Sequence, residues 1–293
     1  MPLRSAGGAP RSSRGVGRLR QAPARRERSA LAVAGAVFAL VALVGVGIGA
    51  YVLSRASHVA IDPETLCPVE QPPAEVVAVL LDMSDRLNEV QLLAVRNHLN
   101  RILYGELPRF ARVEVYAVQD RPSAVAEPVV GLCNPGKGDD LSRIYQNPDL
   151  ARRRWERDFA ESIGAKLDAL LAAPDSASSP IFEAIQAVAV RLFGKPEYDG
   201  VPKRLIVVSD LLQNVRGRGS HGSHYRGVPA FEEFRSSPYF AQVRADLDGV
   251  RVHLYYMNRS DQSVQGARHI RFWDEYFSAQ GATVMTVERI FGD

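Results

Sequence analysis

The longest apolar stretch of the chain lies near the start of the sequence. Residues 30–53 read ALAVAGAVFALVALVGVGIGAYVL and contain no charged side chain. With a rise of about 1.5 Å per residue, a helix of this length can cross a hydrocarbon core of about 30 Å. A buried core helix and a signal peptide cut after Ala50 or Ala56 are the alternatives, but signal-peptide cores usually span only about 7–15 residues. We therefore predict one transmembrane helix over residues 29–54.

Beyond residue 75, short apolar runs alternate with segments of helical periodicity. The apolar runs predict strands at 76–81, 113–118, 125–132, 205–208, 250–256 and 283–287. Apolar residues at helical spacing predict helices at 84–103, 149–172, 180–192 and 261–280, with Ser84 or Asp85 as the N-cap of the first helix. Because strands alternate with helices, we expect residues 75–293 to form an α/β fold: a doubly wound, mostly parallel sheet with helices on both faces.

Charge divides the chain into two parts. Residues 1–28 contain eight arginines and one acidic residue, a charge of +7, whereas the whole chain carries +3. The remainder therefore carries −4, which gives no support for a nucleic-acid-binding face on the folded part. Cytoplasmic flanks of membrane helices carry the excess of arginine and lysine. We expect the N-terminus in the cytoplasm and the C-terminal domain outside the membrane. The abundance of arginine and alanine suggests a bacterial inner (plasma) membrane and a periplasmic or extracellular domain.

Both cysteines follow the apolar stretch. Cys67 lies in the predicted linker 55–74, which is rich in proline, and Cys133 lies in a second loop that contains proline and glycine. An oxidising compartment would allow a disulfide between them, and two unrelated reduced thiols are the alternative. If it forms, the disulfide ties the linker to a loop of the domain.

Polar side chains stand where two of the predicted strands end. Asp82 and Ser84 follow the first strand, and Asp210 follows the strand at 205–208. Ser179 lies between them in the sequence and precedes the proline that opens a predicted helix. In open α/β sheets ligands bind beyond the carboxyl ends of the strands. An aspartate at a strand end and a serine N-cap also occur without any ligand, so a purely structural role is an equal alternative.

These segments, in this order, resemble the von Willebrand factor A (VWA) domain. That family places an Asp-x-Ser-x-Ser motif after its first strand, a threonine before a helix and an aspartate after its fourth strand. The resemblance implies that Asp82, Ser84, Ser179 and Asp210 hold a divalent cation, usually Mg²⁺. It also implies that an acidic residue of a protein partner completes the coordination.

One position departs from the family pattern. Where the motif has its second serine, this chain has Arg86. A guanidinium is a permanent cation, and Mg²⁺ prefers octahedral coordination by oxygen. Arg86 could pair with Asp82 or Asp210 and take the place of the metal charge, or it could point into solvent. Two neighbouring carboxylates repel each other, so they need a compensating charge in either case.

The segment after Asp210 is a second candidate for contact with a partner. Residues 215–227 read VRGRGSHGSHYRG, and Arg216, Arg218, His221, His224 and Arg226 could contact an acidic partner or an anion. A solvated surface loop is the simpler interpretation. His221 and His224 also have a metal-ligand spacing but lack a third ligand nearby. The sequence contains no nucleophile-elbow, Walker or dinucleotide-binding motif, so we do not expect an enzyme.

Three functions therefore remain open. The first is a membrane-anchored, extracytoplasmic VWA-like module that binds a protein, with a divalent cation at its site. The second is a metal-free scaffold or assembly component of a cell-envelope complex, which the arginine at position 86 favours. A metal-dependent hydrolase built on the two aspartates is the third and has the least support.

Overall fold

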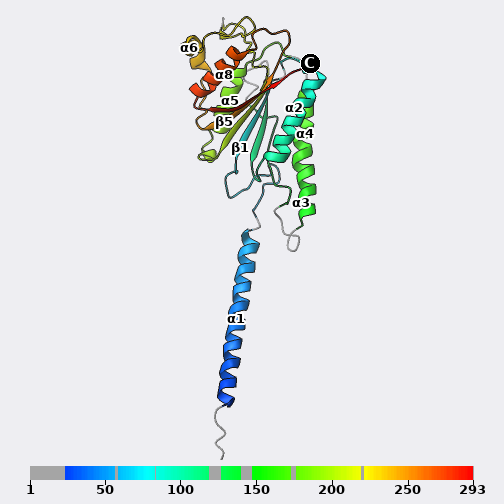
Figure 1. The fold of residues 1–293 in the computed structure, drawn as a ribbon, viewed down its shortest axis with the longest axis vertical. Helices are drawn as coiled ribbons and strands as arrows, with labels where there is room; N and C mark the ends of the chain where they lie inside the picture. Colours follow the sequence, from blue (N-terminus) through cyan, green and yellow to red (C-terminus); the bar gives the residue numbers. More distant parts are fainter. Residues whose placement is uncertain are drawn as a thin grey trace, which may run out of the picture. The chain divides into compact units, whose positions relative to one another are not determined.

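A computed structural model describes most of the chain and divides it into two compact units, residues 1–58 and 59–293. The first unit contains the helix α1 (Ala24–Ala56), in which Ala32–Tyr51 is long and apolar enough to cross a membrane (Figure 1). The predicted linker divides between the units, since residues 59–74 belong to the second. The structure describes residues 24–56, 59–82, 84–118, 127–139, 147–172, 176–218 and 221–292.

The second unit is built on one six-stranded sheet. Its strands are β1 (Val76–Asp82), β2 (Arg112–Val118), β3 (Val130–Cys133), β4 (Lys203–Ser209), β5 (Val250–Met257) and β6 (Thr283–Ile290). The order is β3-β2-β1-β4-β5-β6, and every neighbouring pair is parallel except β2 with β3. This is the predicted doubly wound, mostly parallel sheet. The order reverses between β1 and β4, so the carboxyl ends of these two strands form its switch point.

Helices cover both faces of the sheet (Figure 1). Successive side chains of β1 point to opposite faces: Ala78 and Leu80 pack in one apolar core and Val77, Val79 and Leu81 in the other. All of these side chains are fully buried. The first core includes α5 (Ile181–Val188), α6 (Phe231–Arg235), α7 (Pro238–Gln242) and α8 (Ala267–Ala279); the second includes α2 (Glu89–Arg101) and α4 (Glu161–Leu171).

Helix boundaries differ from the sequence prediction in several places. The N-cap of α2 is Asn88, whose side chain accepts from the Gln91 amide in a capping box, rather than Ser84 or Asp85. Five-residue turns of π-helix extend α2 and α5, as η1 (Ile102–Glu106) and η4 (Ala189–Phe193). The predicted helix 149–172 consists of α3 (Pro148–Arg154), η3 (Trp155–Ala160) and α4. The predicted helix 261–280 begins only at Ala267, and α6 and α7 were not predicted.

The predicted disulfide is present. Cys67 and Cys133 are bonded, with their Cα atoms 4.8 Å apart. Cys133 is the last residue of β3, and its amide also donates to the Thr65 carbonyl at 2.8 Å. Asp62 organises the preceding turn by accepting from the amides of Glu64 and Thr65. The segment that enters the domain is thus fastened to the edge strand of the sheet.

Candidate functional site

Asp82 and Asp210 meet at the switch point of the sheet. Asp82 is the last residue of β1, and Asp210 directly follows β4, the neighbouring parallel strand. Both are buried: Asp82 is 3% exposed and Asp210 2%. The two carboxylates therefore lie at neighbouring strand ends, on one edge of the sheet.

Hydroxyl and amide groups surround the Asp82 carboxylate. Ser179 and Ser209 donate their hydroxyls to Asp82 Oδ2, at 2.9 and 2.7 Å, and the Ser84 amide donates to Oδ1 at 3.1 Å. Ser179 reaches this position because its backbone pairs with Asn214, just beyond β4. All four predicted residues thus lie at one end of the sheet. Ser209, which we did not predict, is the residue before Asp210 and adds a second hydroxyl.

An arginine from the loop that follows β5 binds Asp210. Arg259 Nε lies 3.0 Å from Asp210 Oδ2, and the side chain of Arg259 is only 13% exposed. Its Nη1 donates to the Arg86 carbonyl at 2.8 Å and its Nη2 to the Asp85 carbonyl at 3.1 Å. From the sequence, Arg86 could pair with Asp82 or Asp210, or point into solvent. The ion pair with Asp210 is instead made by Arg259, while Arg86 contributes its main-chain carbonyl to hold that guanidinium.

Burial and charge determine the protonation of Asp210. Desolvation, and then the nearby Asp82 carboxylate, raise the pKa of Asp210 to about 7, although Arg259 and the Leu212 amide act in the opposite direction. Burial also raises the pKa of Tyr225, whose hydroxyl donates to Asp85 Oδ2 at 3.1 Å. Each added negative charge at this end of the sheet is thus unfavourable, which makes the guanidinium important for its stability.

A buried aromatic cluster supports the backbone below Asp210. Leu211 has a φ of 58°, a strained value for a residue other than glycine. Its carbonyl accepts from Trp273 Nε1 at 3.0 Å and lies 3.1 Å from His269 Nε2. Tyr256 holds the other ring nitrogen of His269 at 2.6 Å. These contacts fix the turn that aims the Asp210 carboxylate at Arg259.

The basic loop that follows Asp210 is only partly exposed. Arg216, Arg218 and Arg226 are exposed, and Arg218 Nη1 donates to Gln242 Oε1 at 2.5 Å. His224 is fully buried: its Nδ1 lies 3.3 Å from His269 Nε2, and its ring packs edge-on against Phe272. His224 is therefore a core residue and not part of a contact surface. Burial lowers the pKa of His224 to about 3.

The carboxylates at the switch point are arranged to bind a guanidinium rather than a divalent cation. Asp82 accepts three hydrogen bonds from within the domain, and Asp210 is already paired with Arg259. As arranged, Arg259 supplies a positive counter-charge to Asp210.

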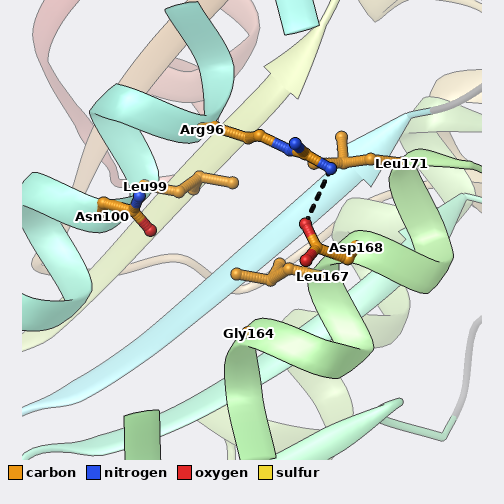
Figure 2. Close-up of a pocket in the computed structure, with 7 residues that line it drawn as sticks. All are labelled: Arg96, Leu99, Asn100, Gly164, Leu167, Asp168 and Leu171. Carbon is orange, nitrogen blue, oxygen red and sulfur yellow. Dashed lines mark ion pairs between the residues drawn. The ribbon is translucent and has the colours of Figure 1, made fainter. Parts of the chain in front are cut away.

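A small pocket lies away from these strand ends. It encloses about 220 Å³ between α2 and α4, and the Arg96–Asp168 ion pair crosses it at 2.9 Å (Figure 2). Its floor is formed by Leu99 and Leu167, and both charged side chains are largely exposed. Such a pocket offers no buried polar group to orient a ligand, so we do not assign the function to it.

The chain was compared with known proteins. No protein-family model and no curated protein matches it. Among solved structures it is similar to the VWA domain of SpRpn10, at 13% identity over 75% of this chain and 89% of that one, with a TM-score of 0.38. It is also similar to BatB from Bacteroides thetaiotaomicron (14% identity; 73% and 91%; TM-score 0.34). A third similar structure is that of an aerotolerance-related membrane protein from Bacteroides fragilis NCTC 9343 (11% identity; 73% of this chain and 90% of that one; TM-score 0.31). At such values, function has to be argued from this chain's own residues.

Proposed function

We propose that this protein is a membrane-anchored, extracytoplasmic binding module that recognises a protein partner without a metal ion. The observation that carries the proposal is the buried ion pair between Arg259 and Asp210 at the switch point of the sheet. This is the position at which doubly wound domains bind their ligands. The domain would serve as a scaffold or assembly component of a bacterial envelope complex.

Membrane anchoring rests on α1 and on the charges that precede it. The apolar segment Ala32–Tyr51 can span a bilayer, and the arginine-rich residues 1–28 favour a cytoplasmic N-terminus. The disulfide between Cys67 and Cys133 is consistent with an oxidising compartment for the domain. Together these features support a single-pass protein of the inner membrane with its domain in the periplasm or outside the cell.

The chemistry of Arg259 supports the proposal that the site works without a metal ion. Its planar guanidinium cannot lose its proton, and it pairs with Asp210 while donating to two backbone carbonyls. A divalent cation at Asp82 and Asp210 would have to displace this group or share a small space with it at the cost of charge repulsion. The cation-dependent module, with Mg²⁺ held by Asp82, Ser84, Ser179 and Asp210, is the alternative.

The exposed arginines beside the site indicate the charge of the partner. Arg226 follows Tyr225, whose hydroxyl contacts Asp85, and Arg216 lies two residues after Asn214, which pairs with Ser179. The loop therefore flanks the site, and it is basic on a domain whose remaining charge is negative. Such a patch favours an acidic segment of a protein partner, because complementary charge steers association and sets orientation.

Site-specific photocrosslinking in the cells that make the protein tests this proposal. A photoreactive residue placed at Arg216 or Arg226 should give a discrete adduct that persists after chelation of divalent cations. The matched control is Arg152, an exposed arginine on α3. An adduct that disappears on chelation would support the cation-dependent alternative. Adducts from Arg152 but from neither loop position would place the partner surface elsewhere.

A further inference from the structure

A groove runs beside the disulfide, at the end of the sheet where β1 and β2 begin. It encloses about 460 Å³. One wall is the proline-rich segment Pro68–Pro73, and Glu197 and Tyr198 form part of another. Both cysteines line the groove; Cys67 is partly exposed, whereas Cys133 is fully buried. Of the two cysteines, Cys67 is therefore the one that a molecule in the groove can contact.

A fixed guanidinium lies against this disulfide. Arg112 is the first residue of β2 and pairs in register with Cys133, and its Nη1 is 3.4 Å from Cys67 Sγ. Glu114, only 3% exposed, holds Arg112 through Nε at 3.1 Å and Nη2 at 2.7 Å. Tyr116 in turn donates to Glu114. Glu114 thus holds the guanidinium beside Cys67 Sγ.

A neighbouring cation makes a disulfide more reactive. It stabilises the thiolate form of cysteine, and thiol–disulfide exchange is faster when the departing sulfur leaves as a stabilised thiolate. The disulfide of this domain combines that feature with access from a groove. A purely structural disulfide needs neither.

We propose that Cys67–Cys133 is an exchange site for a dithiol protein of the thiol–disulfide oxidoreductase class. One thiolate of the partner attacks Cys67 Sγ, so that a mixed disulfide forms and Cys133 departs as a thiolate near Arg112. The second thiolate of the partner then attacks the partner's own sulfur in the mixed disulfide and releases Cys67. The partner leaves oxidised, and its two electrons and two protons end on Cys67 and Cys133.

Exchange at this site would control how firmly residues 59–73, the segment that leads into the domain, are attached to the sheet. Besides the disulfide, a hydrogen bond from the Cys133 amide to the Thr65 carbonyl joins this segment to β3. The backbone bridge between Ile61 and Pro68 lies within the segment itself. Reduction would leave residues 59–73 with few covalent or hydrogen-bonded restraints. The reduced protein should consequently be cut faster by proteases in this segment than the oxidised protein, while the sheet remains intact.

The test follows reduction of the full-length, detergent-solubilised protein by dithiothreitol in native buffer. Samples are quenched with acid, labelled with a maleimide polymer and separated on a gel. The informative variant is the double substitution R112Q/E114Q, which removes both charges of the pair and leaves no unpaired buried charge. Its matched control is R191Q/E127Q, which removes an exposed ion pair. A brief exposure to 2-mercaptoethanol, followed by alkylation and peptide mapping, identifies the sulfur that is attacked.

We expect wild-type reduction to be proportional to dithiothreitol concentration and much faster than global unfolding. R112Q/E114Q should slow it about tenfold, because the departing thiolate loses its cation, and R191Q/E127Q should leave it unchanged. The mixed disulfide should form on Cys67. Reduction that occurs only at the unfolding rate would overturn the proposal. An unchanged rate in R112Q/E114Q, or a mixed disulfide on Cys133, would overturn it equally.

Discussion

Replacing Arg259 by methionine removes the positive charge from the switch point while keeping a side chain of similar length. Asp210, which is 2% exposed, then loses its ion-pair partner, and the carbonyls of Asp85 and Arg86 lose their donors. Asp82 remains close by with its own negative charge. The substitution therefore leaves two buried carboxylates without the guanidinium that pairs with Asp210.

The expected cost follows from the burial of the pair. Breaking a buried ion pair by removing one partner typically costs about 3–5 kcal/mol. Because Arg259 retains 13% exposure, we expect the lower end, about 3 kcal/mol of unfolding free energy. Because Arg259 lowers the pKa of Asp210, the variant should continue to lose stability as the pH rises above 7, the value near which the wild-type group ionises. A pKa that is raised by folding means that stability is present at low pH and lost as the group ionises.

Urea denaturation followed by tryptophan fluorescence measures this cost, since Trp155 and Trp273 are both buried in the domain. The double variant R259M/D210N is the control, because it removes both charges together. We expect it to recover about 2 kcal/mol of the loss, and the single variant D210N, measured beside it, completes the cycle that gives the coupling energy of the pair. A cost below about 1 kcal/mol for R259M would show that Arg259 is not the counter-charge of Asp210. The same conclusion would follow if the R259M substitution cost as much in the D210N variant as in the wild type.

Three further predictions concern the supporting structure. Folding lowers the pKa of His269 from 6.5 to about 4, so its stabilising effect is present above pH 6.5 and should be lost by about 3 kcal/mol as the pH falls to 4. The pH dependence of urea unfolding should therefore be flatter below 6.5 in His269→Gln than in the wild type, and identical slopes would contradict this. Replacing Cys67 and Cys133 by serine removes a cross-link between residues 66 positions apart, which should cost about 4 kcal/mol in urea unfolding; a loss below about 1 kcal/mol would contradict it. Gln213 is fully buried and its Oε1 caps the amides of Ile181 and Phe182, so Gln213→Leu should lower the free energy of unfolding by about 2 kcal/mol, and an unchanged midpoint would show that the cap is dispensable.

The central strands and the meeting of the two aspartates could be predicted because they depend on local signals. The run from Val76 to Leu81 is apolar at every position, as a strand buried on both faces requires. Parallel strands carry their carboxyl ends to one edge, so Asp82 and Asp210 had to lie at the same edge of the sheet. The cysteines could be paired because no others compete for them.

Arg259 could not be identified because its role depends on the order of the strands in space. It follows β5, which lies next to β4, and only this neighbourhood brings its loop beside Asp210. Within the motif itself, Arg86 was the nearer cation in sequence and therefore the obvious candidate. His224 was misjudged for a related reason. Its loop is rich in glycine and arginine, yet contacts with His269 and Phe272 bury the ring.

Two errors in the helix prediction have simple explanations in the sequence. Asn88 and Gln91 have the spacing of a capping box, but Ser84 and Asp85 precede them and are equally good caps by residue type. The helices α6 and α7 have only five residues each, too few for a periodic pattern to emerge. Their phenylalanine and tyrosine side chains nevertheless complete one of the two cores.

Calorimetric titration with Mg²⁺ and Mn²⁺ shows whether Arg259 takes the place of a bound cation, as we propose. The full-length protein in detergent is titrated beside two variants, Arg259→Ser and Asp82→Ala. We expect no binding by the wild type or by Asp82→Ala, and a gain of binding in Arg259→Ser, where the guanidinium no longer pairs with Asp210. Binding by the wild type that disappears in Asp82→Ala would contradict metal-free recognition and support the cation-dependent module in its place.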